Sequence, residues 1–169
     1  KLVLLVEFIV VFVYFAAPYV MRFALSRKGK IILSGPIYLD DVRSLEVTKH
    51  ADPDYRYAMS AWFYINPQPD NTREAFTKFT NIITRDDNPL VQYNSSTRSL
   101  RISAYTMDES RETIYEKDNI PLQKWNYLVV NYDGGTMDIF LNGNLVISKP
   151  RLIPADSNST AMVRVGEVN

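Results

Sequence analysis

Residues 125–143 read WNYLVVNYDGGTMDIFLNG, a segment with two predicted strands, each followed by a glycine turn. Met137, Ile139 and Leu141 alternate with Asp138, Phe140 and Asn142, which is the period of two of a strand with one buried face. The triplets Asp133–Gly135 and Asn142–Asn144 place glycine where a tight hairpin needs a positive φ. Leu145–Ser148 supplies a third strand, so the sequence predicts an antiparallel meander of three consecutive strands.

The same period of two extends over most of the chain upstream of this meander. Tyr55–Ile65 is apolar on both of its alternating faces, so we expect it to be a central strand. The two prolines of Asn66–Thr72 leave no room for a strand, and Arg73–Lys78 is long enough for one helical turn. Around ten short strands joined by turns indicate an all-β fold, an antiparallel β-sandwich. The other predicted strands are Phe79–Thr84, Pro89–Tyr93, Leu100–Tyr105, Thr113–Glu116 and Met162–Val165.

An apolar run stands at the beginning of the chain. Leu2–Met21 reads LVLLVEFIVVFVYFAAPYVM, with Glu7 as its one charge. A helix of about 20 apolar residues crosses the hydrocarbon core of a bilayer, whereas the apolar part of a secretory signal peptide has only about 7–15. We therefore expect one transmembrane α-helix at residues 1–24, a basic linker at residues 25–30 and the sandwich at residues 31–169.

Four positive charges follow the apolar run, and we expect them at the membrane interface: Arg22, Arg27, Lys28 and Lys30. Positive flanks stay on the cytosolic side, so they favour a single-pass membrane protein with a cytosolic β domain. The absence of cysteine fits a reducing compartment. Two glycosylation sequons, which begin at Asn94 and Asn158, favour an external domain instead.

The composition of the chain excludes several function classes. Its 19 basic and 19 acidic residues give no surplus positive charge, so we expect no nucleic-acid partner. Without cysteine there is no disulfide framework, thiol nucleophile or cysteine-ligated metal site. The single histidine, His50, is expected in a loop and leaves little room for imidazole chemistry.

The meander and the strands before it resemble laminin-G-like, concanavalin A-like jelly rolls. Lys124–Gly134 and Met137–Gly143 are similar to that family's W-x-h-h-h-x-h-D-G and h-x-h-h-h-N-G patterns, where h is apolar. Tyr57–Ile65 and Ile82–Arg85 resemble two of its earlier strands, so the resemblance spans about residues 31–169. It implies a β-sandwich that binds glycans, calcium or proteins, or that serves as a structural module.

One departure from the family lies at the end of the sequence. The family continues past a strand like Met162–Val165 with a closing strand beside the first one, whereas this sequence stops at Asn169. We therefore expect that the chain is truncated here, or that a sheet edge stays open for a partner.

The sequence does not reproduce the catalytic carboxylate pattern of this family's enzymes. Its glucanases carry alternating carboxylates on one strand, with acid and nucleophile about 5 Å apart, whereas Thr136–Phe140 has only Asp138. Asp108–Glu112 carries charges but is predicted to be a solvated loop. Asp40-Asp41 and Asp86-Asp87-Asn88 offer oxygen ligands for calcium, but turns favour these residues in any case. We expect no catalytic residue, no cofactor and no metal.

Glycan recognition uses an exposed aromatic ring with hydrogen-bonding groups beside it. The candidates by residue type are Trp62, Tyr93, Tyr105 and Tyr115, whereas Trp125 begins a strand and is expected in the core.

The sequence predicts a non-enzymatic membrane protein whose β-sandwich docks a protein partner. A membrane span before a cysteine-free jelly roll is similar to membrane-anchored minor capsid proteins of large icosahedral DNA viruses. That resemblance implies a structural role that links a bilayer to a capsid or another protein shell, with the domain between internal membrane and capsid. The alternative is a cell-surface carbohydrate-binding or receptor module, and a degenerate hydrolase is the third interpretation.

Overall fold

The computed structural model describes residues 7, 10–17, 19–20, 31–39, 41–48, 56–153 and 160–166. Internal contacts divide the chain into two units, residues 1–36 and residues 37–169, which are described separately. In the first unit residues 10–17 are helical. Of the helices in the described ranges, none is both long enough and apolar enough to cross a bilayer. Residues 1–6, 8–9, 18 and 21–24 of the predicted span lie outside the described residues.

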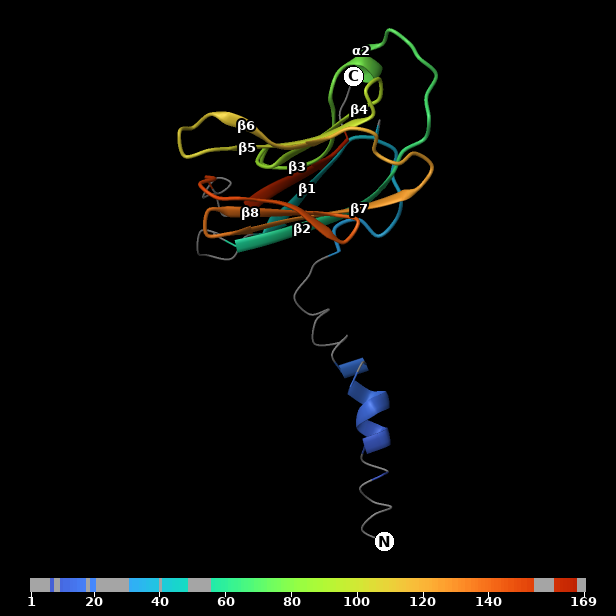
Figure 1. Cartoon of the computed structure of the whole chain (residues 1–169), viewed down its shortest axis with the longest axis vertical. Coiled ribbons are helices and arrows are strands. Elements are labelled where there is room, and N and C mark those ends of the chain that lie inside the picture. The colour runs from blue at the N-terminus through green and yellow to red at the C-terminus, as the bar shows by residue number, and fades with distance from the viewer. Residues whose placement is uncertain are drawn as a thin grey trace. The chain divides into compact units, whose positions relative to one another are not determined.

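The second unit is an antiparallel sandwich of two sheets (Figure 1). Sheet A has six strands, in the spatial order β1 (Arg43–Thr48), β10 (Thr160–Val165), β3 (Thr80–Arg85), β4 (Leu90–Asn94), β5 (Ser99–Tyr105) and β6 (Arg111–Lys117). Sheet B has four, in the order β2 (Arg56–Tyr64), β7 (Trp125–Asp133), β8 (Thr136–Leu141) and β9 (Asn144–Lys149). The short helix α2 (Glu74–Thr77) follows the proline loop and confirms the predicted helical turn.

The predicted three-stranded meander is confirmed as β7, β8 and β9. Gly134 and Gly135 turn the chain between β7 and β8 with φ of 55° and 91°. Asn142 and Gly143, with φ of 53° and 84°, form the second turn. Both central residues of each turn lie in the left-handed region, which matches the twist of a two-residue hairpin. The sequence therefore predicted this part of the fold down to its turns.

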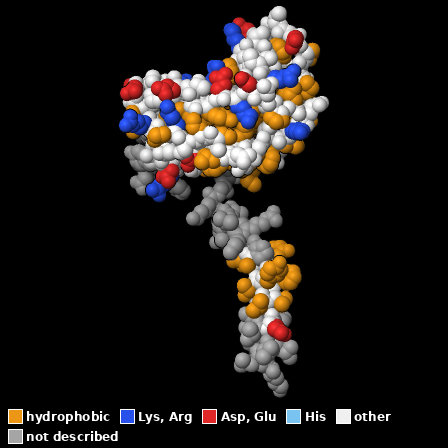
Figure 2. All heavy atoms as spheres, in the orientation of Figure 1, with side chains coloured by type: hydrophobic (Ala, Val, Ile, Leu, Met, Phe, Trp, Pro, Cys, Tyr) orange, Lys and Arg blue, Asp and Glu red, His pale blue; other side chains and the backbone are white. Residues whose placement is uncertain are grey.

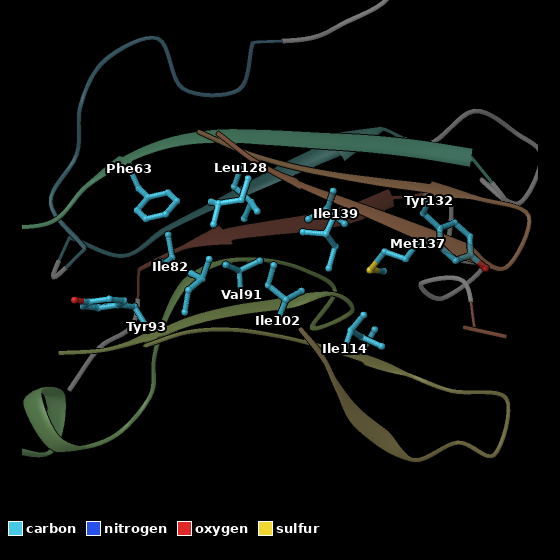
Figure 3. Packing of buried hydrophobic residues seen from close by; sticks show 14 of the residues in the cluster. Phe63, Ile82, Val91, Tyr93, Ile102, Ile114, Leu128, Tyr132, Met137 and Ile139 are labelled. Atoms are coloured by element: carbon cyan, nitrogen blue, oxygen red, sulfur yellow. The ribbon is translucent and has the colours of Figure 1, made fainter. Parts of the chain in front are cut away.

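Apolar side chains from the two sheets meet in one core. Figure 3 shows Phe63, Leu128 and Ile139 of sheet B pointing toward Val91 and Ile102 of sheet A. These side chains are almost completely buried. Removing such a side chain from water contributes about 1.5–3 kcal/mol, so the alternation along the strands is the main source of stability.

One strand was not predicted, and one expectation about a strand is wrong. The sequence pattern missed β1, because Arg43–Thr48 is short and half polar and is held by residue-for-residue pairing with β10. Tyr55–Ile65 was expected to be a central strand, but β2 lies at the edge of sheet B among the strands that the structure describes. Its apolar outer face belongs to a surface rather than to a second buried layer.

Candidate functional site

Four aromatic rings stand on the outer surface of sheet B and are called the aromatic face here. Trp62 of β2 stacks on Tyr127 of β7 with ring centroids 4.6 Å apart. Tyr64 meets Trp125 edge to face at 5.4 Å, two register positions further along the same strands and on the same face. Trp62 is 63% exposed and Trp125 58%. Phe140 and Leu145 continue the apolar surface onto β8 and β9, because Phe140 pairs with both Val129 and Leu145.

The alternation of side chains between the two faces of a strand explains why these rings face outward. Leu128, Val130 and Tyr132 point into the core, so the alternation also turns Asn126 inward and Trp125 outward. Asn126 is satisfied there, since its amide nitrogen donates to the carbonyls of Pro121 (3.1 Å) and Lys124 (3.2 Å). The expectation that Trp125 belongs to the core is therefore wrong. Figure 2 shows that hydrophobic side chains reach the visible surface of this unit between scattered charges.

A hollow of about 60 Å³ lies at one end of the sandwich and is called the end pocket. Its lining begins at Ile65 and Asn66, directly after Tyr64 of the aromatic face, so the two surfaces are neighbours. Phe76, Tyr93 and Leu122 provide apolar lining. The polar lining comes from two loops, as Asn66, Gln68, Asp70, Ser95, Ser96 and Arg98.

The turn that carries half of this lining is fixed by Asn94. Its side-chain oxygen accepts the amide protons of Ser96 (3.0 Å) and Thr97 (3.2 Å). Its side-chain nitrogen donates to the carbonyl of Thr77 at 3.0 Å. The Asn94 side chain is thus a buried structural tie between α2 and the turn. The nitrogen that a sequon glycan would need is engaged inside the folded domain.

Tyr93 connects the core to the end pocket. Tyr93 is only 6% exposed, and in Figure 3 its hydroxyl points away from the core cluster. Burial raises the pKa of the Tyr93 phenol, while the positive charge of Arg98 acts in the opposite direction. Within the described residues, the guanidinium of Arg98 makes no hydrogen bond or ion pair. The end pocket therefore brings the guanidinium of Arg98 and the phenol of Tyr93 into one lining, together with the carboxylate of Asp70.

The candidate calcium residues of the turn after β3 are used for structure. Asp86 accepts the amide proton of Met162 at 2.7 Å, which ties the turn to β10. Asn88 donates to the carbonyl of Ile153 and accepts the amide proton of Tyr105. Asp87 lies 3.6 Å from Arg164. Across the described ranges, no three His, Cys, Asp or Glu residues gather in a way that could hold a metal ion.

The candidate carboxylates do not converge on one strand. Asp138 lies on the outer face of sheet B, directly opposite Asn131 of β7 and Ser148 of β9. Asp108 and Glu109 lie in an exposed turn, as expected, but Glu112 belongs to β6 and pairs with Lys149 at 3.5 Å. The prediction of a loop through Glu112 is therefore wrong at its C-terminal end.

The structure separates the other predicted site residues. Trp62 is exposed, Tyr93 is buried, and Tyr105 and Tyr115 are half-buried on sheet A. The guanidinium of Arg111 covers the ring of Tyr105 at 4.6 Å. Outside the described residues lie Asp40, His50, Asn158 and the predicted membrane-interface residues Arg22, Arg27, Lys28 and Lys30.

Sequence reasoning missed Tyr64 and Tyr127, which complete the aromatic face, and Arg98 of the end pocket. The signal for the first two is the aromatic-x-aromatic spacing of Trp62 with Tyr64 and of Trp125 with Tyr127. Two such strands in antiparallel register place four rings together. No local signal marks Arg98, because its neighbours in the end pocket come from distant segments.

Solved structures with a similar fold come from proteins of several kinds. An HCR/D mutant matches with 13% identity and a TM-score of 0.53, over 75% of this chain and 32% of that chain. The botulinum neurotoxin type G receptor binding domain matches with 17% identity and a TM-score of 0.43, over 75% and 40%. Domain 4 of AbnA, a GH43 extracellular arabinanase from Geobacillus stearothermophilus, solved with arabinotriose, matches with 17% identity and a TM-score of 0.42, over 75% and 58%.

These similarities concern the fold. The chain spans about a third of the length of the HCR/D protein, and the identities are too low to transfer an activity. No curated protein sequence matches the chain significantly. The family model described as the concanavalin A-like lectin/glucanases superfamily matches residues 40–169, which is most of the chain and all of the sandwich. Two packed antiparallel sheets, the glycine-turned meander and this match show that the chain belongs to the concanavalin A-like lectin/glucanases superfamily.

Proposed function

We propose that the protein is a non-enzymatic binding module that docks a protein partner through the aromatic face. The observation that carries this proposal is the exposure of Trp62, Tyr64 and Trp125 side by side on one sheet. Tryptophan and tyrosine are the residues that most often dominate the binding energy of protein interfaces. Their position on paired β-strands keeps the rings ordered before binding, which lowers the entropy lost on association.

The apolar run Leu2–Met21 supports a membrane tether for this module. If the run spans a bilayer, the sandwich lies close to the membrane surface and can link it to a protein shell, such as a capsid. The basic residues Arg22, Arg27, Lys28 and Lys30 favour the cytosolic side of that bilayer.

The docking proposal is tested by crosslinking the full chain in its native setting. The wild type is compared with a Trp62→Ala, Trp125→Ala double variant and with Tyr38→Ala, which removes an 81% exposed aromatic outside the aromatic face. The proposal predicts that the double variant loses the crosslinked partner and that Tyr38→Ala keeps it. Retention of the same partner by the double variant contradicts the proposal.

The membrane tether is tested by washing membranes with alkaline carbonate, which releases a protein that has no membrane span.

Carbohydrate binding is the second candidate, and the end pocket favours it. Asp70, Asn66, Gln68 and the two serines offer both donors and acceptors beside an apolar lining, as sugar hydroxyls and ring carbons require. The discriminating experiment is a glycan array with the folded full chain, compared with Arg98→Ala. A glycan signal that Arg98→Ala abolishes and the aromatic-face variant retains supports this candidate, and a blank array contradicts it.

A further inference from the structure

Asn142 and Gly143, in the turn between β8 and β9, form the one Asn-Gly pair of the sequence. This pair is prone to deamidation, because glycine has no side chain that hinders its backbone nitrogen from reaching the asparagine amide. The Gly143 nitrogen bonds to Cγ of Asn142, its proton leaves with Nδ2 as ammonia, and a succinimide ring results. Water then opens the ring at either carbonyl, which leaves aspartate or isoaspartate at this position.

In the folded meander the amide of Asn142 is held by β7. Its Oδ1 accepts the backbone amide proton of Tyr127 at 2.8 Å, and its Nδ2 donates to Oδ1 of Asn126 at 3.2 Å. The backbone amide of Asn142 also donates to the carbonyl of Tyr127 at 2.8 Å. Ring closure needs the attacking nitrogen about 3–3.5 Å from Cγ and above the plane of the amide. Because the two side-chain hydrogen bonds fix that plane, the reaction requires this turn to open first.

Asn126 cannot exchange its role in the amide pair. It is only 1% exposed, and its Nδ2 donates to the carbonyls of Pro121 at 3.1 Å and Lys124 at 3.2 Å. A rotation of this amide by half a turn would place its oxygen against two carbonyl oxygens. Asn126 therefore has to accept the hydrogen bond, and Asn142 has to donate it.

The product of deamidation cannot restore this arrangement. An ionised aspartate at position 142 has two acceptor oxygens and no donor. One oxygen can still accept the amide proton of Tyr127, but the other then faces Oδ1 of Asn126 without a proton between them. A buried acceptor that loses its partner destabilises the fold. Isoaspartate in addition lengthens the main chain by one carbon within a tight turn, so either product weakens the contact with β7.

The loop of residues 118–124 depends on the same amide pair. Ile120 and Gln123 of this loop donate backbone hydrogen bonds, at 3.1 and 2.9 Å, to two residues of the end pocket lining, and Leu122 itself lines the end pocket. The two hydrogen bonds from Asn126 hold the loop from the side of β7. Asn126 thus connects the turn at Asn142 to the end pocket.

We propose that Asn142 is a deamidation site that the folded domain suppresses through its hydrogen bonds to Tyr127 and Asn126. Opening of the turn permits the reaction, and the product cannot re-form the amide pair, so residues 118–124 and the end pocket loosen irreversibly. This inference goes beyond the proposed docking function and does not depend on it.

The test uses the full chain in detergent at mildly alkaline pH. Peptide mass spectrometry with fragmentation follows the conversion of each asparagine, in the folded chain and in guanidinium chloride. Asn142 should react at least about tenfold faster in the unfolded chain, because the rate in the folded chain follows the population of the open turn. Asn144, which precedes Leu145, is the internal control and should stay largely unreacted in both. Equal rates for Asn142 in the two states overturn the proposal.

Two variants test the amide pair itself. Asn126→Ala removes the acceptor of Asn142 and should raise the rate of deamidation in the folded chain at least about threefold. An unchanged rate overturns the role of the pair. Asn142→Asp imitates the product without the reaction, so it gives a result even if Asn126→Ala does not fold.

Amide hydrogen exchange reads the effect of Asn142→Asp on the loop. The amides of Ile120 and Gln123 should exchange at least about tenfold faster than in the wild type. Asn144→Asp, which adds the same charge two residues further on, should leave both rates unchanged. Unchanged exchange in Asn142→Asp, or equal acceleration in both variants, overturns the proposed link to the end pocket.

Discussion

Trp62 and Tyr127 face each other directly across β2 and β7, with their ring centroids 4.6 Å apart and their planes 27° from parallel. Both rings stand on the solvent side of sheet B. Their contact can form only when β2 and β7 pair in this register, so it stabilises that register. The pair therefore contributes to stability as well as to the surface that we propose for docking.

We predict that the two rings are energetically coupled. In a double-mutant cycle, Trp62→Ala and Tyr127→Ala should show a coupling free energy of about 0.5–1.5 kcal/mol in urea unfolding. Pairing Trp62→Ala with Met107→Ala, an exposed residue in the turn between β5 and β6, should give additive effects. Additive effects of Trp62→Ala and Tyr127→Ala would show that the stacked contact contributes no free energy to folding.

Among the glycines that the structure describes, Gly166 should be the least tolerant of substitution. Its φ is +81°, and an added Cβ would collide with the backbone carbonyl of Leu39. Its amide also donates to the carbonyl of Ile82 at 3.0 Å, so the backbone there is held in place. We expect Gly166→Ala to lower the free energy of unfolding by about 2 kcal/mol or more.

Two other glycines serve as controls that separate the cost of backbone strain from the cost of a steric collision. Gly143 has a φ of +84° with open space around it, so Gly143→Ala should lose only about 1 kcal/mol, from backbone strain. Gly35 has neither a positive φ nor a close neighbour, and Gly35→Ala should change the unfolding free energy by less than about 0.5 kcal/mol. Equal losses for Gly166→Ala and Gly143→Ala would contradict the collision with Leu39.

Asn94→Ala should destabilise the domain through the turn that lines the end pocket. The substitution leaves the amides of Ser96 and Thr97 and the carbonyl of Thr77 without their partner. We expect a loss of about 1–3 kcal/mol in thermal or urea unfolding. Asn71 caps the amide of Arg73 in the same manner but on the surface, so Asn71→Ala should lose clearly less. A similar loss of unfolding free energy in both variants would show that burial does not strengthen the hydrogen bonds of Asn94.

Alkaline pH should weaken the fold through Tyr57. Burial raises the pKa of its phenol well above the ordinary value, and the nearby Arg85 reduces this effect only in part. Below pH about 10 the phenol is protonated in both states, and the stability is fully present. Above that pH the unfolded chain ionises first, so unfolding becomes easier by about 1.4 kcal/mol per pH unit until the folded state ionises too.

Urea unfolding of the wild type and Tyr57→Phe between pH 8 and pH 11 measures this effect. The wild type should lose more stability over this range than the variant does, whatever their difference at pH 8. Parallel pH profiles for the two proteins would exclude Tyr57 as the group responsible.

The sequence predicted the sandwich well where local patterns dominate. The turns at Gly134 and Gly143 and the alternation of Leu128, Val130 and Tyr132 are encoded within a few residues, and the structure confirms them. β1 was missed because its short, half-polar sequence carries little signal, and its partner β10 lies more than a hundred residues away.

The candidate site was predicted only in part, for two physical reasons. Residue type and a place at the start of a strand favour a core position for Trp125, whereas the buried positions of the same strand turn it outward. The end pocket joins loops after β2 and β4 with Leu122, and no pattern in one segment reveals that meeting. The position of β2 at an edge is likewise a property of the whole strand order and not of its own residues.

The pairing of β1 with β10 has a consequence for biosynthesis. β10 lies between β1 and β3, with Arg43 opposite Val165 and Ile83 also opposite Val165. During translation the meander β7–β9 can close as soon as it leaves the ribosome, but β1 has to wait until residues 160–165 emerge. The nascent chain therefore carries β1 unpaired while residues 49–159 are made, and we expect ribosome-associated chaperones to be needed for efficient production of this domain.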